Sequence, residues 1–451
     1  MLCVVVINGE YIKKEMIMNF NPLKEKGTPI EKQLRSWHDI VKRPFDKHDI
    51  DCYSRTRQIL MNGIEVEAWG FKHNLARMMP CEETRKLLAY THRIEDMHQT
   101  TVNWMTPACQ SVLETTLGYE QVAIDLTAWL AQNEPDEYVQ ETFNFGLLED
   151  FDHLYRYSQW AYLQHGINPD NILQGQTDVL IARPTQYHHN CNAMRLRNPY
   201  DKETTTPQTK VNILTLVSAE QQTHNFYAEH GMMYGNDDLR RLYGEICDVE
   251  QEHVTMYESL IDPNESVWEK LLLHEFTEVC TYYNCYKDET HEKLKLIWEE
   301  FLSHEIEHLR IASELFKKND HRDPEEIIGD KVVMPCHFES QKEYVTDILL
   351  NEVDKRLDGS EERSFAKIDE LPEGWESYEV QDIVNGCGAP SEQAIQLSIT
   401  SIGRDIAIAS KKLVDKQPEL LERALEEQSQ APNTVTVEDY EDMQDVEMLE
   451  F

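Results

Sequence analysis

The stretch LYGEICDVEQEHVTMYESL, residues 242–260, contains the pattern that decides the fold. Its apolar and aromatic side chains recur at intervals of three or four residues, which is typical of a helix with one buried face. Glu250 and His253 belong to that face, because side chains three residues apart leave an α-helix on the same side. A second Glu-x-x-His step, from Glu305 to His308, lies in a similar stretch. Two such helices can bind metal between them.

Two single glutamates supply the remaining ligand types of a dinuclear carboxylate site. Glu220 lies 30 residues before Glu250, and Glu275 lies 30 residues before Glu305. A glutamate from each of two helices and a Glu-x-x-His step from each of two others form such a site in the core of a four-helix bundle. Buried carboxylates without partners are costly, and a pair of divalent ions neutralises four of them. A buried hydrogen-bonded network is the alternative interpretation.

Residues 207–318 resemble the ferritin-like di-iron or di-manganese carboxylate proteins, and among these they are most similar to rubrerythrin. The resemblance depends on the two Glu-x-x-His steps, on Glu220 followed by Tyr227, and on Glu275 and Glu278 in the third helix. It implies a four-helix bundle that holds two iron or manganese ions. It also implies that Glu278 is an additional ligand that moves with the oxidation state. A salt-bridged glutamate on a helix is the alternative for Glu278.

The same ligand pattern occurs a second time, 155 residues earlier in the chain. The matching positions are Glu65, Glu95, His98, Glu120, Asp150 and His153. Five of the six residue types agree, and the spacings of 30, 25 and 30 residues between successive carboxylates are identical in both halves. We interpret this pattern as a tandem duplication of one four-helix unit. Because Asp150 is one methylene shorter than the glutamate it replaces, we expect the first site to be weaker or degenerate.

The repeat divides the chain into six predicted segments. These are an N-terminal extension (1–53), a first four-helix bundle (54–166), a long linker (167–206), a second bundle (207–320), a helical C-terminal segment (321–430) and an acidic, disordered tail (431–451). The predicted fold class is all-α, with two tandem ferritin-like four-helix bundles and an additional helical C-terminal segment. We expect one helix over 30–41 and two over 342–357 and 390–416. The last two either pack on the bundles or make homodimer contacts.

Some residues outside the ligand set are candidates for supporting roles. Tyr227 and Tyr282 lie two helical turns after Glu220 and Glu275, so each should lie near a bundle core. There a tyrosine could hydrogen-bond a ligand or carry an electron, and core packing is the alternative. The linker also contains ligand-type side chains, although residues in such loops are more often incidental: His188, His189 and Cys191.

Composition limits the partners and the compartment that we expect. The net charge of −40 opposes binding to nucleic acid and to anionic membranes. The ten cysteines include no Cys-x-x-Cys pair, so a rubredoxin-type iron centre or a zinc ribbon is not expected, and an electron donor must be external. The N-terminal MLCVVVI is too short for a signal peptide, and no apolar run approaches the length of a membrane span. We therefore expect a cytoplasmic protein.

The ligand set favours redox chemistry. Carboxylates combined with two imidazoles suit iron or manganese, and two neighbouring ions can transfer two electrons together. We predict two iron or manganese ions in each bundle and an oxidoreductase that acts on peroxide or O2 with an external electron donor. A ferroxidase or other iron-handling protein is one alternative. A di-iron oxygenase with an organic substrate is another.

Overall fold

A computed structural model describes residues 20–180 and 182–402 of the chain. This part is mostly helical, with fifteen α-helices and two short strands, so the all-α prediction is confirmed. The strands β1 (Lys355–Leu357) and β2 (Phe365–Lys367) form an antiparallel hairpin. None of the described helices combines the length and the apolar composition needed to cross a bilayer. The predicted disordered tail, 431–451, lies outside the described residues.

Eight long helices form the body of the molecule, in four hairpins of two helices each. They are α3 (Cys52–Met78), α4 (Glu82–Asn103), α5 (Val112–Asn133), α6 (Glu137–His165), α9 (Pro207–His230), α10 (Asp237–Glu258), α11 (Val267–Asp288) and α12 (Glu292–Asp320). Their starts follow from local sequence. Asp51 and Asp136 accept hydrogen bonds from the free N–H groups of α3 and α6, and Ser111 forms a capping box with Glu114 at α5.

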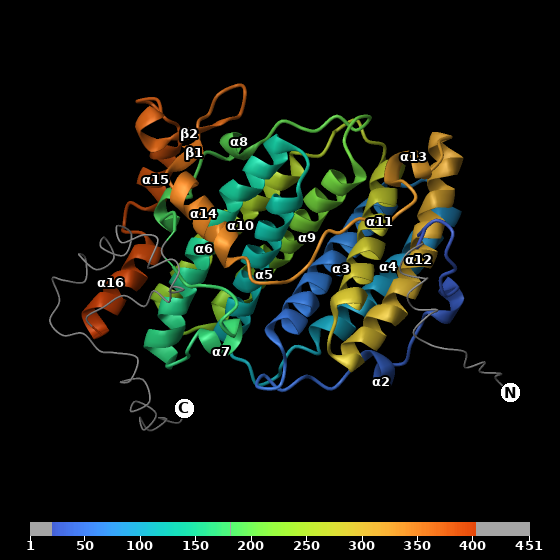
Figure 1. Cartoon of the computed structure of the whole chain (residues 1–451), viewed down its shortest axis with the longest axis horizontal. Coiled ribbons are helices and arrows are strands. Elements are labelled where there is room, and N and C mark those ends of the chain that lie inside the picture. Colours follow the sequence, from blue (N-terminus) through green and yellow to red (C-terminus); the bar gives the residue numbers. More distant parts are fainter. Residues whose placement is uncertain (1–19, 181, 403–451) are drawn as a thin grey trace.

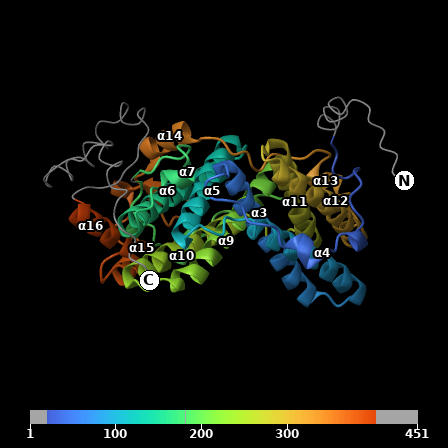
Figure 2. The same cartoon turned by 90° about the horizontal axis from the view of Figure 1, so that it is seen from below.

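The hairpins combine into two four-helix groups that cross the boundary between the sequence halves. Group A contains α3, α4, α11 and α12, and group B contains α5, α6, α9 and α10 (Figures 1 and 2). Helices α3 and α9 pack against each other where the groups meet. A Cβ atom on Gly63 of α3 would lie 2.8 Å from the carbonyl oxygen of Ser218 on α9. The absence of a side chain at Gly63 therefore permits this close approach.

The structure corrects the predicted grouping of ligands by sequence half. We expected residues 54–166 and 207–320 each to enclose one site, yet each group takes one hairpin from each half. The physical reason is that the duplicated hairpins present equivalent faces. The α3–α4 hairpin can therefore close against α11–α12 as readily as against its neighbour α5–α6. The spacing of ligands along one helix does not decide which hairpins meet.

The segments between and after the hairpins pack on these groups. In the extension, a short 3-10 helix, η1 (Ile30–Lys32), and α2 (Trp37–Ile40) replace the single helix predicted over 30–41. The linker contains α7 (Asp170–Leu173), η2 (Thr185–Tyr187) and α8 (Asn192–Arg195), and the turn before α10 contains η3 (Gly231–Met233). Gly27 lies so close to α12 that a Cβ atom would meet the Glu307 nitrogen at 2.4 Å.

The C-terminal segment differs from the prediction of two helices. Its elements are α13 (Glu325–Ile328), α14 (Lys342–Glu352), the β1–β2 hairpin, η4 (Ile368–Glu370), α15 (Ser377–Val384) and α16 (Pro390–Ile402). The helix predicted over 342–357 ends at Glu352, and Lys355–Leu357 pair with β2 instead. Helix α16 packs on α6 and α10 of group B. The rest of the helix predicted over 390–416 lies outside the described residues.

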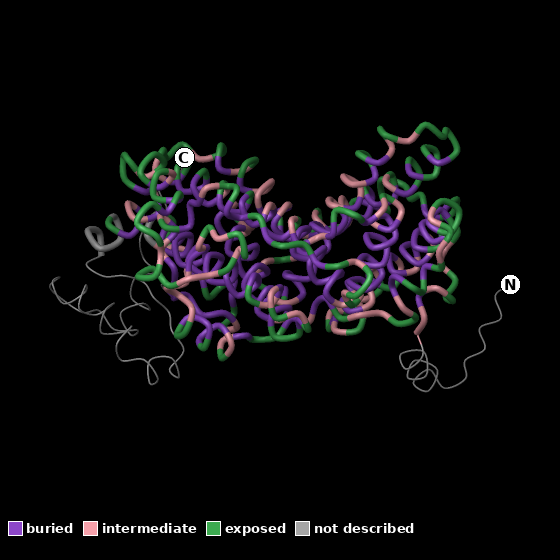
Figure 3. The backbone as a smooth tube through the Cα atoms, turned by 90° about the horizontal axis from the view of Figure 1, so that it is seen from above, coloured by how far each residue is buried: buried purple, intermediate pink, exposed green. Residues whose placement is uncertain are grey.

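Buried residues run along the helices of both groups, while exposed residues concentrate at the ends and in the outer segments (Figure 3). Glu289 is a buried polar residue that connects α3 to the turn before α12. Its carboxylate accepts hydrogen bonds from Ser54 Oγ at 2.6 Å, Arg57 Nε at 3.0 Å and Trp298 Nε1 at 3.0 Å. Burial opposes its charge, but the hydrogen bond and charge of Arg57 outweigh burial and lower the pKa of Glu289.

Substitution Glu289→Gln should reduce the free energy of unfolding by about 3 kcal/mol at pH 7, because Arg57 is left buried without its counter-charge. The folded pKa of Glu289 lies below its ordinary value of 4.5. The stabilisation is therefore present above that pH and is lost as the pH falls through the folded pKa. Urea unfolding of both proteins between pH 7 and pH 3 tests this.

The control for Glu289 is Glu300→Gln, which breaks an exposed ion pair with Arg35. That change should cost less than about 1 kcal/mol at every pH. A difference between wild type and Glu289→Gln that stays constant down to pH 3 would contradict a charged role for Glu289.

Candidate metal centres

Group B brings six predicted ligands into one buried cluster, which we call centre B: Glu120, Asp150, His153, Glu220, Glu250 and His253. One ligand atom from each of Asp150, Glu220, Glu250 and His253 lies within 4.8 Å of the others. Glu120, His153 and Glu250 form a second set of the same kind. Glu250 belongs to both sets, so its two oxygens are placed to bridge two cations.

The contacts inside centre B are short and leave carboxylate oxygens free. His153 Nδ1 lies 3.0 Å from Glu250 Oε1, and His253 Nδ1 lies 3.2 Å from both Glu250 Oε2 and Asp150 Oδ1. Neither oxygen of Glu220 or of Asp150 accepts a hydrogen bond from a described residue. Buried carboxylate oxygens without donors are costly, and a divalent cation is the partner that this donor set suits.

Group A forms the corresponding centre A from the other six ligands: Glu65, Glu95, His98, Glu275, Glu305 and His308. Its two sets are Glu95, Glu275, Glu305 and His308, and Glu65, His98 and Glu305. His98 Nδ1 lies 3.1 Å from Glu305 Oε1, and His308 Nδ1 lies 2.9 Å from Glu305 Oε2. Glu305 therefore occupies the bridging position that Glu250 occupies in centre B.

The two bridging carboxylates are the most strongly stabilised anions of the centres. Burial opposes their charge, but the imidazoles of His153 and His253 lower the pKa of Glu250, and those of His308 and His98 lower the pKa of Glu305. In return, Glu65 and Glu305 outweigh the effect of burial and raise the pKa of His98 to about 9. His98 in centre A and His253 in centre B, whose pKa values are both raised by carboxylates, thus favour the charged form and partly compensate those carboxylates.

The pKa values of the two non-bridging glutamates of centre B are raised, in contrast to the lowered pKa of Glu250. Burial, together with the nearby charge of Glu250, raises the pKa of Glu120 well above its ordinary value. Burial and the charge of Asp150 do the same for Glu220. Burial therefore favours the neutral form of both side chains, and a bound divalent ion would favour their ionisation.

Each ligand histidine has a fixed partner on its outer nitrogen, which orients the ring toward the centre. The four pairs are His98 Nε2 with His304 Nδ1 at 2.8 Å, His308 Nε2 with Gln33 Oε1 at 2.8 Å, His153 Nε2 with His188 Nδ1 at 3.3 Å, and His253 Nε2 with Glu149 Oε2 at 2.8 Å. Glu149 and His304 are equivalent in the repeat, 155 residues apart. The other two partners come from the extension and the linker.

The linker histidines therefore differ in role from direct ligands. His188 stands behind His153, and its Nε2 lies 2.6 Å from the carbonyl oxygen of Arg183. His189 belongs to a separate set with Asp248 and Glu252, in which Asp248 is exposed. Cys191 belongs to none of the sets of ligand-type side chains found among the described residues.

A buried charge network surrounds Glu149 beside centre B. Arg195 Nη1 donates to Glu149 Oε2 at 2.8 Å, and Arg183 Nη1 lies 3.3 Å from Glu149 Oε1. Arg195 Nε also donates to Glu252. Burial opposes the charge of Glu149, but Arg195 outweighs it and holds the pKa of Glu149 well below its ordinary value. A permanent carboxylate therefore faces the outer nitrogen of His253.

Tyr227 and Tyr282 contact glutamates on neighbouring helices. The hydroxyl of Tyr227 donates to Glu120, and the hydroxyl of Tyr282 donates to Glu65. Tyr227 also begins a series of rings that continues through Tyr157 and Tyr243 to the partly exposed Tyr234, with centroid distances of 5.2, 4.9 and 5.5 Å. Both predicted tyrosines thus lie beside the centres.

Lys72 belongs to centre A but was not among the residues predicted from the sequence. Its side chain is fully buried in centre A, where Nζ forms an ion pair with Glu95, lies 2.6 Å from Glu275 Oε1 and lies 3.7 Å from Glu278 Oε2. Glu278 is also buried, and neither of its oxygens accepts a hydrogen bond from a described residue. The repeat contained the signal, because Lys72 lies 155 residues before Tyr227 and seven after Glu65.

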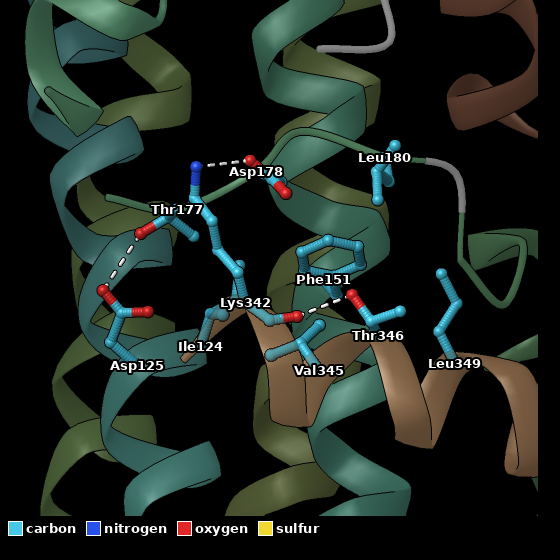
Figure 4. A pocket seen from close by; sticks show the side chains of 10 residues that line it. All are labelled: Ile124, Asp125, Phe151, Thr177, Asp178, Leu180, Lys342, Val345, Thr346 and Leu349. Carbon is cyan, nitrogen blue, oxygen red and sulfur yellow. Dashed lines mark hydrogen bonds and ion pairs between the residues drawn. The ribbon is translucent and has the colours of Figure 1, made fainter. Parts of the chain in front are cut away.

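Two pockets lie near the centres, and only one of them touches a ligand. A cavity of about 120 Å³ is lined by His98 and His304 together with Arg35, Asp39 and Glu300 near the surface. It offers a polar route toward centre A. A second, narrower pocket lies between group B and α14, where Lys342 reaches Asp178 and Thr177 donates to Asp125 (Figure 4). None of the predicted ligands lines that pocket.

The structure thus places all thirteen predicted ligand residues in two buried clusters, twelve in the sets above and Glu278 beside Lys72. It distributes them between the halves differently from the prediction. Comparison of the chain with protein-family models, curated proteins and solved structures found no match.

Proposed function

We propose that this protein is a metal-dependent redox protein that binds iron or manganese in centres A and B and acts on peroxide or O2. The observation that carries the proposal is the pairing of buried imidazoles with carboxylate oxygens that accept no hydrogen bond, repeated in both centres. A structural polar network would satisfy those oxygens with donors. The gathering of these carboxylates and imidazoles from four helices in each group supports the same proposal.

The chain's own residues have distinct roles in this proposal. Glu250 and Glu305, which each belong to both ligand sets of their centre, would hold the ions together with the other carboxylates of those sets. His253 and His308 each present Nδ1 to one of these two glutamates. Iron or manganese bound at such ligands would supply the electrons that reduce peroxide or O2. Tyr227 donates a hydrogen bond to Glu120 and fixes the orientation of that carboxylate. Burial of the centres keeps bulk water from competing for the ligands.

The first test is the metal content of variants that remove one bridging carboxylate. Glu250→Gln should remove about two ions per chain, because both positions of centre B share Glu250. Glu305→Gln should empty centre A in the same way. The matched control is Glu134→Gln, since Glu134 is a buried carboxylate that accepts from Thr209 and Asn212 outside both centres. Elemental analysis after growth with iron and manganese gives the counts.

Two results would contradict the proposal. Wild-type protein without bound iron or manganese would leave two buried polar networks. Metal-loaded protein that consumes neither peroxide nor O2 in the presence of a reductant would exclude the redox role. Loss of the same amount of metal in Glu134→Gln as in Glu250→Gln would show that the decrease reflects general destabilisation.

A further inference from the structure

The two centres differ at one position that the repeat makes directly comparable. In each group, two helices carry a single glutamate, and the repeat makes the residues seven positions later comparable. In group B these residues are Tyr227 and Thr127, and in group A they are Tyr282 and Lys72. Tyr227, Tyr282 and Lys72 each contact the single glutamate on the other helix of their group. Tyr227 and Tyr282 each donate one hydrogen bond to the opposite glutamate. Lys72 is the one member of this set that carries a positive charge.

Lys72 also reaches further into its centre than the tyrosines do. Besides Glu275 on the opposite helix, its ammonium group forms an ion pair with Glu95. Glu95 and Glu275 belong to the same set of ligand atoms, together with Glu305 and His308. The ammonium nitrogen therefore lies between two carboxylates, Glu95 and Glu275. A metal ion at this position would need both of them as ligands.

A metal ion bound by both carboxylates would lie roughly 2 Å from their oxygens. The Lys72 nitrogen is 2.6 Å from Glu275 Oε1 and contacts Glu95 as well. The two cations would thus compete for the same oxygens in a buried site, where their repulsion is only weakly screened. At the second position of centre A, formed by Glu65, His98 and Glu305, the corresponding residue is Tyr282, which donates a hydrogen bond to Glu65 and carries no positive charge.

We propose that the Lys72 ammonium permanently occupies one of the two cation positions of centre A, so that centre A binds a single metal ion while centre B binds two. This inference rests on the proposed metal-binding function. Centre A then holds its ion at Glu65, His98 and Glu305, next to the cavity that reaches His98. A single ion exchanges one electron at a time, whereas the pair in centre B can exchange two. The two centres therefore have different chemical roles in one chain.

The experiment compares the metal content of wild type and Lys72→Met, which keeps the length of the side chain and removes the charge. Wild type should contain about three ions per chain and Lys72→Met about four, because the freed position can accept an ion. Lys210→Met is the matched control, since Lys210 is a buried lysine that pairs with Glu265 and Glu269 away from both centres. It should leave the count at about three.

Anomalous X-ray scattering from wild-type crystals provides a measurement that does not depend on the folding of a variant. One peak between Glu65 and His98 and two peaks in centre B are expected. Two peaks in centre A of the wild type would overturn the inference, as would an unchanged ion count in folded Lys72→Met. Absence of metal from all three proteins would instead refute the proposed function.

Discussion

Removal of bound metal with a chelator is expected to lower the thermal unfolding temperature of the protein by about 10 °C or more. A ligand present at about a thousand times its dissociation constant stabilises the folded state by about 4 kcal/mol per site. Each kcal/mol corresponds to about 2–4 °C for a domain of 150–250 residues, and to less for a larger one. In the metal-free state burial also opposes the ionisation of Glu120 and Glu220, since it raises the pKa of both groups.

Scanning calorimetry of the metal-loaded and stripped protein at pH 7 measures this effect. Addition of excess Mn²⁺ to the stripped protein should restore the original transition. The control is the double variant Glu250→Gln/Glu305→Gln, which lacks both bridging carboxylates and should respond little to the chelator. An unchanged unfolding temperature of the wild type after complete removal of metal would mean that the two networks are stable without it.

Glu149→Gln should weaken metal binding at centre B, although Glu149 belongs to neither ligand set of that centre. It removes the carboxylate that faces His253 Nε2 and leaves Arg195 and Arg183 buried with less counter-charge. Loss of such a partner typically reduces metal affinity about 10- to 100-fold. Breaking the buried ion pair should also reduce the free energy of unfolding by about 3–5 kcal/mol.

Competition with a chromophoric chelator separates the two effects of Glu149→Gln. About two ions should be released at a lower chelator concentration than in the wild type, while the ion of centre A keeps its affinity. His304→Gln is the control, because His304 has the equivalent position behind His98 in centre A. In His304→Gln, the ion of centre A should be released at a lower chelator concentration, while the ions of centre B keep their affinity. Equal weakening of both centres by Glu149→Gln would contradict a local role for this carboxylate.

The ligand residues could be predicted from sequence because helical spacing relates side chains on one element. Glu250 and His253 had to leave the same face of their helix, and the constant offset identified the matching residues in the first half. The same offset links Lys72 to Tyr227 and Glu149 to His304, so comparison of these pairs would have indicated that the centres differ. Those residues were overlooked because their chemical types are not conserved between the halves.

Helical spacing could not predict which residues hydrogen-bond the ligand histidines, nor which hairpins pack together. Gln33 and His188 approach the centres from segments without regular periodicity, and only the folded chain shows their contacts with His308 and His153. The choice between two equivalent hairpin pairings depends on packing at the α3–α9 crossing, where Gly63 permits close approach. The β1–β2 hairpin was missed because each strand has only three residues.

The crossed arrangement of the hairpins determines which of the two centres is completed first during synthesis on the ribosome. The helices of group B are consecutive in the chain, from Val112 to Glu258, whereas group A consists of the hairpins on either side of them. All ligands of centre B are therefore synthesised before α11 and α12. The α3–α4 hairpin must wait, with Lys72 and its carboxylates uncovered, until synthesis has passed Asp320. Centre B can thus acquire its ions while centre A is still incomplete, and a nascent chain halted near residue 260 would already contain one complete set of ligands.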